Sequence, residues 1–177
     1  MLKDISSPPR TAFDVFRMLP EGTLAEVIEN QLFMAPSPSP DHQEASGNIF
    51  IEISLFVRKN KLGKVFIAPI DLYLDEYSNV VQPDLLFISK NNSLIIDKRG
   101  LKGVPDLVIE VLSPGNKKYD SVKKKNLYEK FGVKEYWIVD PETKIATGFL
   151  LKGAVYVNQK ESRGQLRSSV LGKSFSF

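Results

Sequence analysis

Two carboxylates, each beside a strongly hydrophobic run, are the residues of this chain best suited to chemistry. Asp84 lies within the run Val-Val-Gln-Pro-Asp-Leu-Leu-Phe-Ile, and Glu110 ends the run Pro-Asp-Leu-Val-Ile-Glu. A helix predicted after the second run carries Lys124. Carboxylate oxygens bind hard divalent cations, and such a cation together with a lysine can neutralise charge on a reacting phosphate. If these three residues meet in the folded chain, they supply the minimum equipment for metal-assisted phosphodiester hydrolysis.

The composition restricts which metals and nucleophiles are available. The chain has no cysteine, which excludes disulfides, thiolate metal sites and cysteine nucleophiles. Its single histidine, His42, also excludes a zinc site built from several imidazoles. Any metal must therefore bind to oxygen ligands, which favours magnesium, manganese or calcium.

Length and charge are those of an ordinary globular protein. The 177 residues, 42% hydrophobic and 25% charged, are expected to form one domain over 1–177. The net charge of +3 permits nucleic-acid binding without arguing for it. The N-terminal segment has no apolar run of signal-peptide length, and no later run is long enough to span a bilayer. The sequence therefore predicts a soluble, cytoplasmic protein.

The first sixty residues are expected to form two helices and a hairpin. A short helix is predicted over 11–18, and two strands between 24 and 35 are joined by a turn at Glu29–Asn30. Asp41 and Glu44 have the spacing of a helix N-cap and its reciprocal partner. Apolar residues at three- and four-residue steps continue this helix to residue 59.

The rest of the chain alternates strand-like and helical patterns, while residues 89–103 are loop-like. A second long helix is predicted over 119–131, ending at Gly132. The most apolar run, 105–112, is favoured for the centre of the sheet. Strands are predicted over 64–68, 71–74, 81–88, 105–112, 135–140, 145–151, 154–158 and 169–175. These patterns indicate an α/β fold with a central mixed sheet, two principal helices and a β-rich C-terminal end.

The helix predicted over 119–131 contains four lysines, and helical geometry separates them. At about 100° per residue, Lys124 lies within roughly 15° of the centre of the apolar face, whereas the other three lysines lie roughly 90° or more away. Lys124 is therefore expected to point inward, where an unpaired ammonium group would be very costly. Asp120, one turn earlier, or Glu110 could supply its anionic partner. The apolar face is defined by Leu127, Tyr128 and Phe131.

These residues form a pattern that resembles a known family. The pattern comprises Pro83-Asp84, Pro105-Asp-Leu-Val-Ile-Glu110-Val-Leu-Ser-Pro114, Asp120 with Lys124 and Tyr128, Gly132-Val-Lys-Glu-Tyr-Trp-Ile-Val-Asp140, and upstream Glu26-Val-Ile-Glu29 and Pro36-Ser-Pro-Ser-Pro-Asp-His42. It resembles the large bacterial family of putative restriction endonucleases, within the PD-(D/E)XK nuclease superfamily, over nearly the whole chain. The resemblance implies a restriction endonuclease-like core with an N-terminal β-hairpin, and a magnesium-dependent endonuclease acting on DNA.

The resemblance also assigns roles to individual residues. Asp84 matches the aspartate of the motif and Glu110 its (D/E), so that both would bind Mg²⁺ or Mn²⁺ together with the backbone carbonyl of Val111. The motif's lysine position is occupied by Leu112. In this family a lysine on the following helix is thought to take over, and Lys124 stands at that position. The resemblance and the helical geometry thus select the same catalytic lysine.

Further candidates surround these three residues. Glu29 could complete the metal site, although a turn residue is the plainer interpretation, and Glu26 is also a weak candidate. His42 could touch the site, although a capping or packing histidine is more common. Asp120 could pair with the lysine. The basic residues proposed to contact phosphates are Lys117, Lys118 and Lys123, but a run of charge is usually a solvated face.

Two other functions are compatible with the same pattern. A domain of this fold that has lost turnover could bind nucleic acid or another protein, and a nuclease could act on RNA or on repair intermediates. Nothing in the sequence identifies a recognition module. Because both strands of a duplex are naturally cut by a symmetric dimer, we also predict a homodimer with C2 symmetry.

Overall fold

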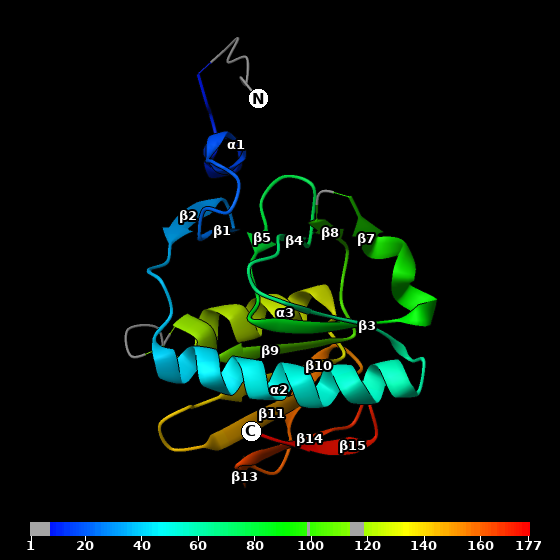
Figure 1. Ribbon diagram of the computed structural model, residues 1–177. Helices are drawn as coiled ribbons and strands as arrows, with labels where there is room; N and C mark the ends of the chain where they lie inside the picture. The colour runs from blue at the N-terminus through cyan, green and yellow to red at the C-terminus, as the bar shows by residue number, and fades with distance from the viewer. Residues whose placement is uncertain (1–7, 99, 114–118) are drawn as a thin grey trace.

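The computed structural model describes residues 8–98, 100–113 and 119–177, with only the backbone described at 119–121. Its centre is a mixed β-sheet that is covered on both faces, and a smaller sheet lies beside it (Figure 1). Among the described residues, seven strands form the main sheet in the order β12-β11-β10-β9-β6-β3, with β13 beside β11. The smaller sheet has the order β2-β1-β5-β4-β8-β7.

The elements follow one another without a long interruption. The N-terminal part contains α1 (Ala12–Met18), β1 (Ala25–Ile28), β2 (Gln31–Met34), α2 (Pro40–Lys59) and β3 (Gly63–Ile67). The middle contains β4 (Leu72–Tyr73), β5 (Val80–Val81), β6 (Leu85–Ser89), a 3₁₀ helix (Lys90–Ile95), β7 (Ile96–Asp97), β8 (Gly100–Lys102) and β9 (Leu107–Val111). The C-terminal part contains a π-helical turn (Tyr119–Lys124), α3 (Lys125–Phe131), β10 (Glu135–Val139), β11 (Ile145–Lys152), β12 (Val155–Asn158), β13 (Ser162–Arg163), β14 (Gln165–Ser168) and β15 (Lys173–Ser176).

Strand β9 lies inside the main sheet, as its apolar sequence predicts. It pairs with β10 in parallel and with β6 antiparallel. Because successive side chains of a strand point to opposite faces, Leu107, Ile109 and Val111 pack with α2. Val108 points to the other face, where α3 lies, and Glu110 shares that side by alternation.

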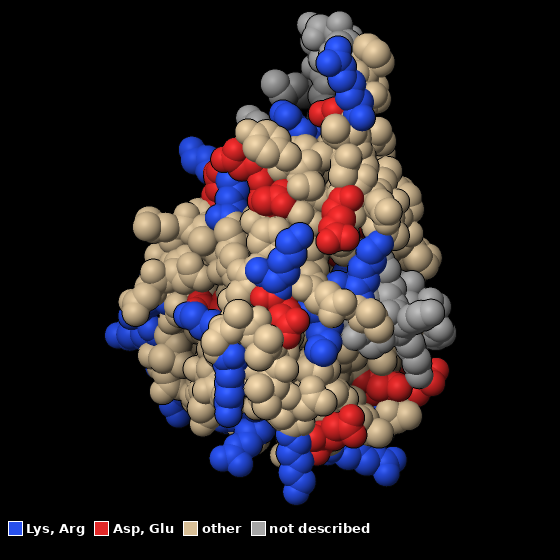
Figure 2. All heavy atoms as spheres, turned by 180° about the vertical axis from the view of Figure 1, so that it is seen from behind, with Lys and Arg blue, Asp and Glu red and all other residues tan. Residues whose placement is uncertain are grey.

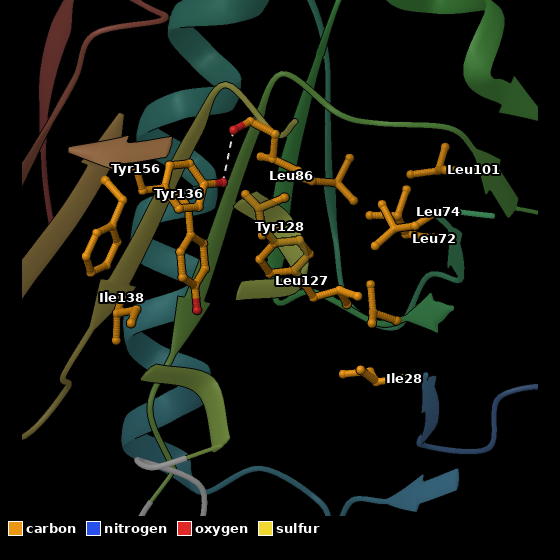
Figure 3. Close-up of a cluster of buried hydrophobic side chains, with 14 of the residues drawn as sticks. Ile28, Leu72, Leu74, Leu86, Leu101, Leu127, Tyr128, Tyr136, Ile138 and Tyr156 are labelled. Carbon is orange, nitrogen blue, oxygen red and sulfur yellow. Dashed lines mark hydrogen bonds between the residues drawn. The ribbon is translucent and has the colours of Figure 1, made fainter. Parts of the chain in front are cut away.

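One hydrophobic cluster joins the two sheets. Ile28 of β1, Leu72 of β4 and Leu101 of β8 belong to the same buried cluster as Leu127 and Tyr128 of α3 (Figure 3). Tyr136, Tyr156 and Ile138 extend this cluster along the main sheet, and the hydroxyl of Tyr156 donates to the carbonyl of Val133 at 2.9 Å. The smaller sheet is thus held against the main sheet by buried apolar contacts, and this fixes the position of β1 relative to β9.

Several sequence predictions hold and others need correction. The hairpin, the first long helix and the mixed sheet are present. The helix predicted over 119–131 is a π-helical turn followed by the shorter α3, which Gly132 ends with φ 83°. The predicted cap of the first long helix was wrong. Ser39 is the N-cap and accepts from the backbone N–H of His42, while Pro40 occupies the first turn, where a missing N–H does no harm. Asp41 therefore lies inside the first turn.

Two predicted strands were also wrong. The run 81–88 is divided between β5 of the smaller sheet and β6 of the main sheet, because Pro83 cannot donate to a ladder. The predicted last strand over 169–175 includes the turn that joins β14 to β15. That turn places the backbone N–H groups of Ser169 and Val170 on the buried carboxylate of Glu135 at 2.9 Å each. Within the described chain, no helix is long and apolar enough to cross a membrane.

Candidate active site

A pocket of about 280 Å³ opens where the two sheets meet the first turn of α2. Its polar lining is formed by Glu26, His42, Gln82, Asp84, Glu110 and Lys124. Its apolar wall is formed by the β1–β2 hairpin and two proline segments, through Phe33, Met34, Pro36, Pro38 and Pro69. The pocket therefore gathers Asp84, Glu110, Lys124 and His42, four of the residues selected from the sequence, together with Glu26 and Gln82.

Asp84 and Glu110 are neighbours across the sheet. The register pairs Leu85 with Ile109, so Asp84 lies directly opposite Glu110 at the next position of the antiparallel pair. Directly opposite residues point to the same face, where their Cβ atoms lie about 5 Å apart. The backbone N–H of Val111 donates to Oδ2 of Asp84 at 2.7 Å. The two acids therefore face one pocket, as the sequence predicted.

Lys124 connects Glu110 to an acid from the other sheet. Its Nζ lies 2.9 Å from Oε1 of Glu110 and 2.9 Å from Oε1 of Glu26, and the lysine is 5% exposed. The prediction that Lys124 points inward is confirmed. The ammonium is stabilised because both partners are ionisable carboxyls held at hydrogen-bonding distance, which offsets the cost of burying charge.

Tyr128 fixes the orientation of Glu110. Tyr128 lies one helical turn after Lys124. Its hydroxyl donates to Oε1 of Glu110 at 2.7 Å. Burial, and then the negative charge of Glu110, raise the pKa of Tyr128 well above its usual value. The hydroxyl therefore stays protonated and remains a donor to the carboxylate.

Glu26 is the residue that sequence reasoning undervalued. It is 8% exposed in a strand whose other residues are all buried, and its Oε1 also accepts from the backbone N–H of Gln82 at 2.7 Å. The signal was present, because a charged residue within the apolar stretch Ala25–Ile28 needs a buried partner. Glu29, named as a possible additional ligand, is exposed in the turn at φ 50°, in line with its plainer interpretation as a turn residue. Its Oε1 lies 3.7 Å from Nζ of Lys130, and it does not line the pocket.

His42 reaches the site from the first turn of α2. Its Nε2 lies 3.1 Å from Oδ2 of Asp84, and its Nδ1 lies 3.5 Å from Oγ of Ser46. Because an ionised carboxylate only accepts hydrogen bonds, the proton on Nε2 is the one shared with Asp84. The buried histidine of α2 thus holds one carboxylate oxygen of Asp84.

Of the three lysines predicted to contact phosphates, only Lys123 lies among the described residues. Lys117, Lys118 and the side chain of Asp120 lie outside the described residues. Lys123 donates to Oε1 of Gln31 at 3.0 Å, and its Nζ lies 4.2 Å from the ring centre of Phe33 at the pocket wall. Figure 2 shows the molecule from behind the view of Figure 1. On the face seen there, Lys and Arg side chains of the described residues are interspersed with Asp and Glu. Charge alone therefore does not mark a path for nucleic acid there.

The donor set can be compared with what a divalent cation requires. Within the described residues, no group of three or more His, Asp or Glu side chains is arranged to hold a metal by itself. Mg²⁺, however, commonly uses one or two carboxylates and completes its shell with waters and substrate phosphate oxygens. Asp84 and Glu110 offer two carboxylates on one face of one pocket, so the residues present fit such an ion.

The fold and the pocket define the class of protein to which this chain is similar. The structure matches the crystal structure of a "putative nuclease belonging to DUF820" from Anabaena variabilis ATCC 29413, with a TM-score of 0.72 and 19% identity. The match covers 93% of this chain and 92% of that chain, and it establishes a shared nuclease-like fold.

The family follows from the sequence. The family model "Uma2: Putative restriction endonuclease" matches residues 13–175, and the chain belongs to this family. No curated protein matches the sequence. The family and the mixed α/β fold predicted from the motifs are therefore confirmed.

Proposed function

We propose that this protein is a divalent-metal-dependent nuclease that hydrolyses phosphodiester bonds in DNA. The observation that carries this proposal is the convergence, in one pocket, of two register-paired carboxylates and a buried lysine that bridges one of them to a third acid. Membership of the family supports a nuclease, and the chemistry of the donor set supports the metal.

The metal would be held by Asp84, Glu110 and the backbone carbonyl of Val111. When bound, Mg²⁺ or Mn²⁺ lowers the pKa of a coordinated water and opposes negative charge on the reacting phosphate. The remaining steps belong to the protein. His42 and the Val111 N–H hold one oxygen of Asp84, so that this carboxylate keeps one orientation toward the pocket.

Lys124 would stabilise the charge that develops on the phosphate. An ammonium group held by two carboxylates is a poor base, because both neighbours favour its charged form. Glu26 and Glu110 hold it from opposite sheets, and Tyr128 fixes Glu110 in turn. The apolar wall of the pocket excludes water from one side, which strengthens each electrostatic contact.

Cleavage assays with matched variants test the proposal. Wild type, Asp84→Asn and Glu110→Gln are compared on supercoiled plasmid, circular single-stranded DNA and RNA, with Mg²⁺, Mn²⁺ or a chelator. We expect cleavage of DNA that needs the metal and falls by at least about 100-fold in either variant. The control is Asp41→Asn, an exposed acid in the first turn of α2. Equal activity in wild type and Asp84→Asn would end the proposal.

Calorimetry separates the enzyme from an inactive binding domain. We expect wild type to bind Mn²⁺ and Asp84→Asn to bind it much more weakly. DNA binding without any carboxylate-dependent Mn²⁺ binding would favour the non-catalytic alternative. Preferential cleavage of RNA would keep the chemistry and change the substrate.

A further inference from the structure

The outward face of α2 carries apolar side chains where a surface helix is normally polar. Ile49 and Ile53 are buried against the main sheet, while Ile51, midway between them, points about 160° away from each. Ile51 and Leu55 remain 55% and 56% exposed, and they lie one turn apart on the same face. Figure 1 shows α2 in the foreground, with no other element drawn across it.

The exposed residues of this face have the spacing of a helix–helix seam. Successive steps of four, three, four and three residues connect Glu44, Asn48, Ile51, Leu55 and Arg58, all of them exposed. This is the spacing of a seam between two packed helices. The apolar pair lies at its centre, and opposite charges lie at its two ends.

At Glu44, Ile51 and Arg58 the seam is self-complementary about Ile51, and Gly47 lies beside it. When a second copy of α2 runs antiparallel across it, residues equally distant from Ile51 on either side meet. Ile51 then meets its own copy, Gly47 meets Leu55, and Glu44 meets Arg58. A surface that matches itself in this way is the requirement for a two-fold, isologous interface.

Two further observations concern the residues at the edges of this seam. Neither Glu44 nor Arg58 forms an ion pair with another residue of the described chain, so both charges remain available to a second molecule. Gly47 lies inside the helix, and a Cβ added there would meet nothing within 4 Å. No contact among the described residues therefore requires glycine at this position, where it weakens the helix by about 1 kcal/mol relative to alanine. A leucine packed from a second helix would use that space.

We propose that α2 is the two-fold interface of a homodimer, in which two copies of the helix pack antiparallel with Ile51 on the axis. One helix pair buries less than the roughly 1,600 Å² of a standard interface, so we expect dissociation in the micromolar range. His42 lies nine residues from the axis, which separates the two active-site pockets by about 27 Å along the helix direction.

Single-cysteine cross-linking tests the geometry directly, because the chain contains no cysteine. Under mild oxidation we expect Ile51→Cys to form a disulfide-linked dimer, since position 51 meets itself on the axis. The control is Glu52→Cys, which is also exposed but lies about 100° further round the helix. An absence of cross-linking at position 51, or equal cross-linking at both positions, would overturn the proposal.

Charge exchange tests which residues meet. In sedimentation velocity, we expect Glu44→Arg or Arg58→Glu to weaken dimerisation by about tenfold or more, and the double exchange to restore it. Ile51→Glu should be monomeric with an unchanged circular dichroism spectrum. A wild type that stays monomeric at about 100 µM, or a dimer that tolerates Ile51→Glu, would refute this interface. None of these measurements uses nuclease activity, so their outcome is independent of the proposed function.

Discussion

Lys124 joins two acids that come from different sheets. Glu110 belongs to the centre of the main sheet and Glu26 to the smaller sheet, and the lysine lies 2.9 Å from both. Breaking a buried ion pair by removing one partner is strongly destabilising, because the other charge stays buried without compensation. The same side chain therefore supports both the site and the fold around it.

Replacing Lys124 by methionine tests this dual role. We expect Lys124→Met to lower the free energy of unfolding by about 3 kcal/mol, because two buried acids lose their shared cation. Mn²⁺ should raise the Tm of this variant more than that of wild type, since a divalent cation can replace the lost charge. Lys130→Met, in the following helix α3 but exposed, should change stability by less than about 1 kcal/mol. Equal melting curves for the two variants would contradict the prediction.

At the scale of elements, Asp106 anchors the end of the main sheet that lies away from the pocket. Its Oδ2 accepts from the backbone N–H of Ser89 at 2.7 Å, and its Oδ1 pairs with Nζ of Lys134. The residue thereby connects the end of β6 with the starts of β9 and β10. Burial alone would raise the pKa of Asp106, but the hydrogen bonds from Lys134 and Ser89 outweigh it and lower the pKa.

The lowered pKa predicts a specific dependence of stability on pH. A carboxyl whose folded-state pKa is depressed contributes stability that is fully present above its unfolded value, near pH 4, and is lost as the pH falls toward the folded value. Asp106→Asn should therefore lower stability at pH 7 and show a shallower loss below pH 4 than wild type does. Denaturant unfolding between pH 2.5 and pH 7 measures the difference, and parallel curves for the two proteins would disprove the assignment.

At the scale of the whole molecule, the site depends on how firmly the two sheets are held together. Ile28 lies two residues after Glu26 in β1 and belongs to the cluster that joins the sheets (Figure 3). Its neighbour Val27 points to the other side, into a separate cluster with Phe13 and Phe16 of α1. Val27 and Ile28 are thus both buried in β1, but of these two only Ile28 belongs to the cluster that joins the sheets.

Truncating these two residues separates positioning from general stability. Ile28→Ala and Val27→Ala should each destabilise the fold by about 2–4 kcal/mol, because both leave a cavity. Only Ile28→Ala should also reduce nuclease activity measured well below the Tm, because only it loosens Glu26 relative to Glu110. Equal losses of activity in the two variants would show that the cluster joining the sheets has no positioning role.

The local sequence by itself predicted the two acids, the inward lysine and most of the principal helices and strands. Asp84 and Glu110 stand beside apolar runs, so alternation and pairing bring them to one face, and the helical period turns Lys124 inward wherever the helix packs. His42 was also found, because one helix carries it at its first turn. Strand alternation and the helical period involve residues close together in the sequence, so the sequence alone shows them.

The tertiary structure decided which further acid joins the site. Glu26 and Glu29 lie three residues apart in the hairpin, and the sequence did not show which of the two would reach the site. Glu26 reaches Lys124 only because β1 pairs with β5, and because the link at Gln82 crosses from the smaller sheet to the main sheet. That pairing joins residues more than fifty positions apart, and no periodicity within the hairpin encodes it.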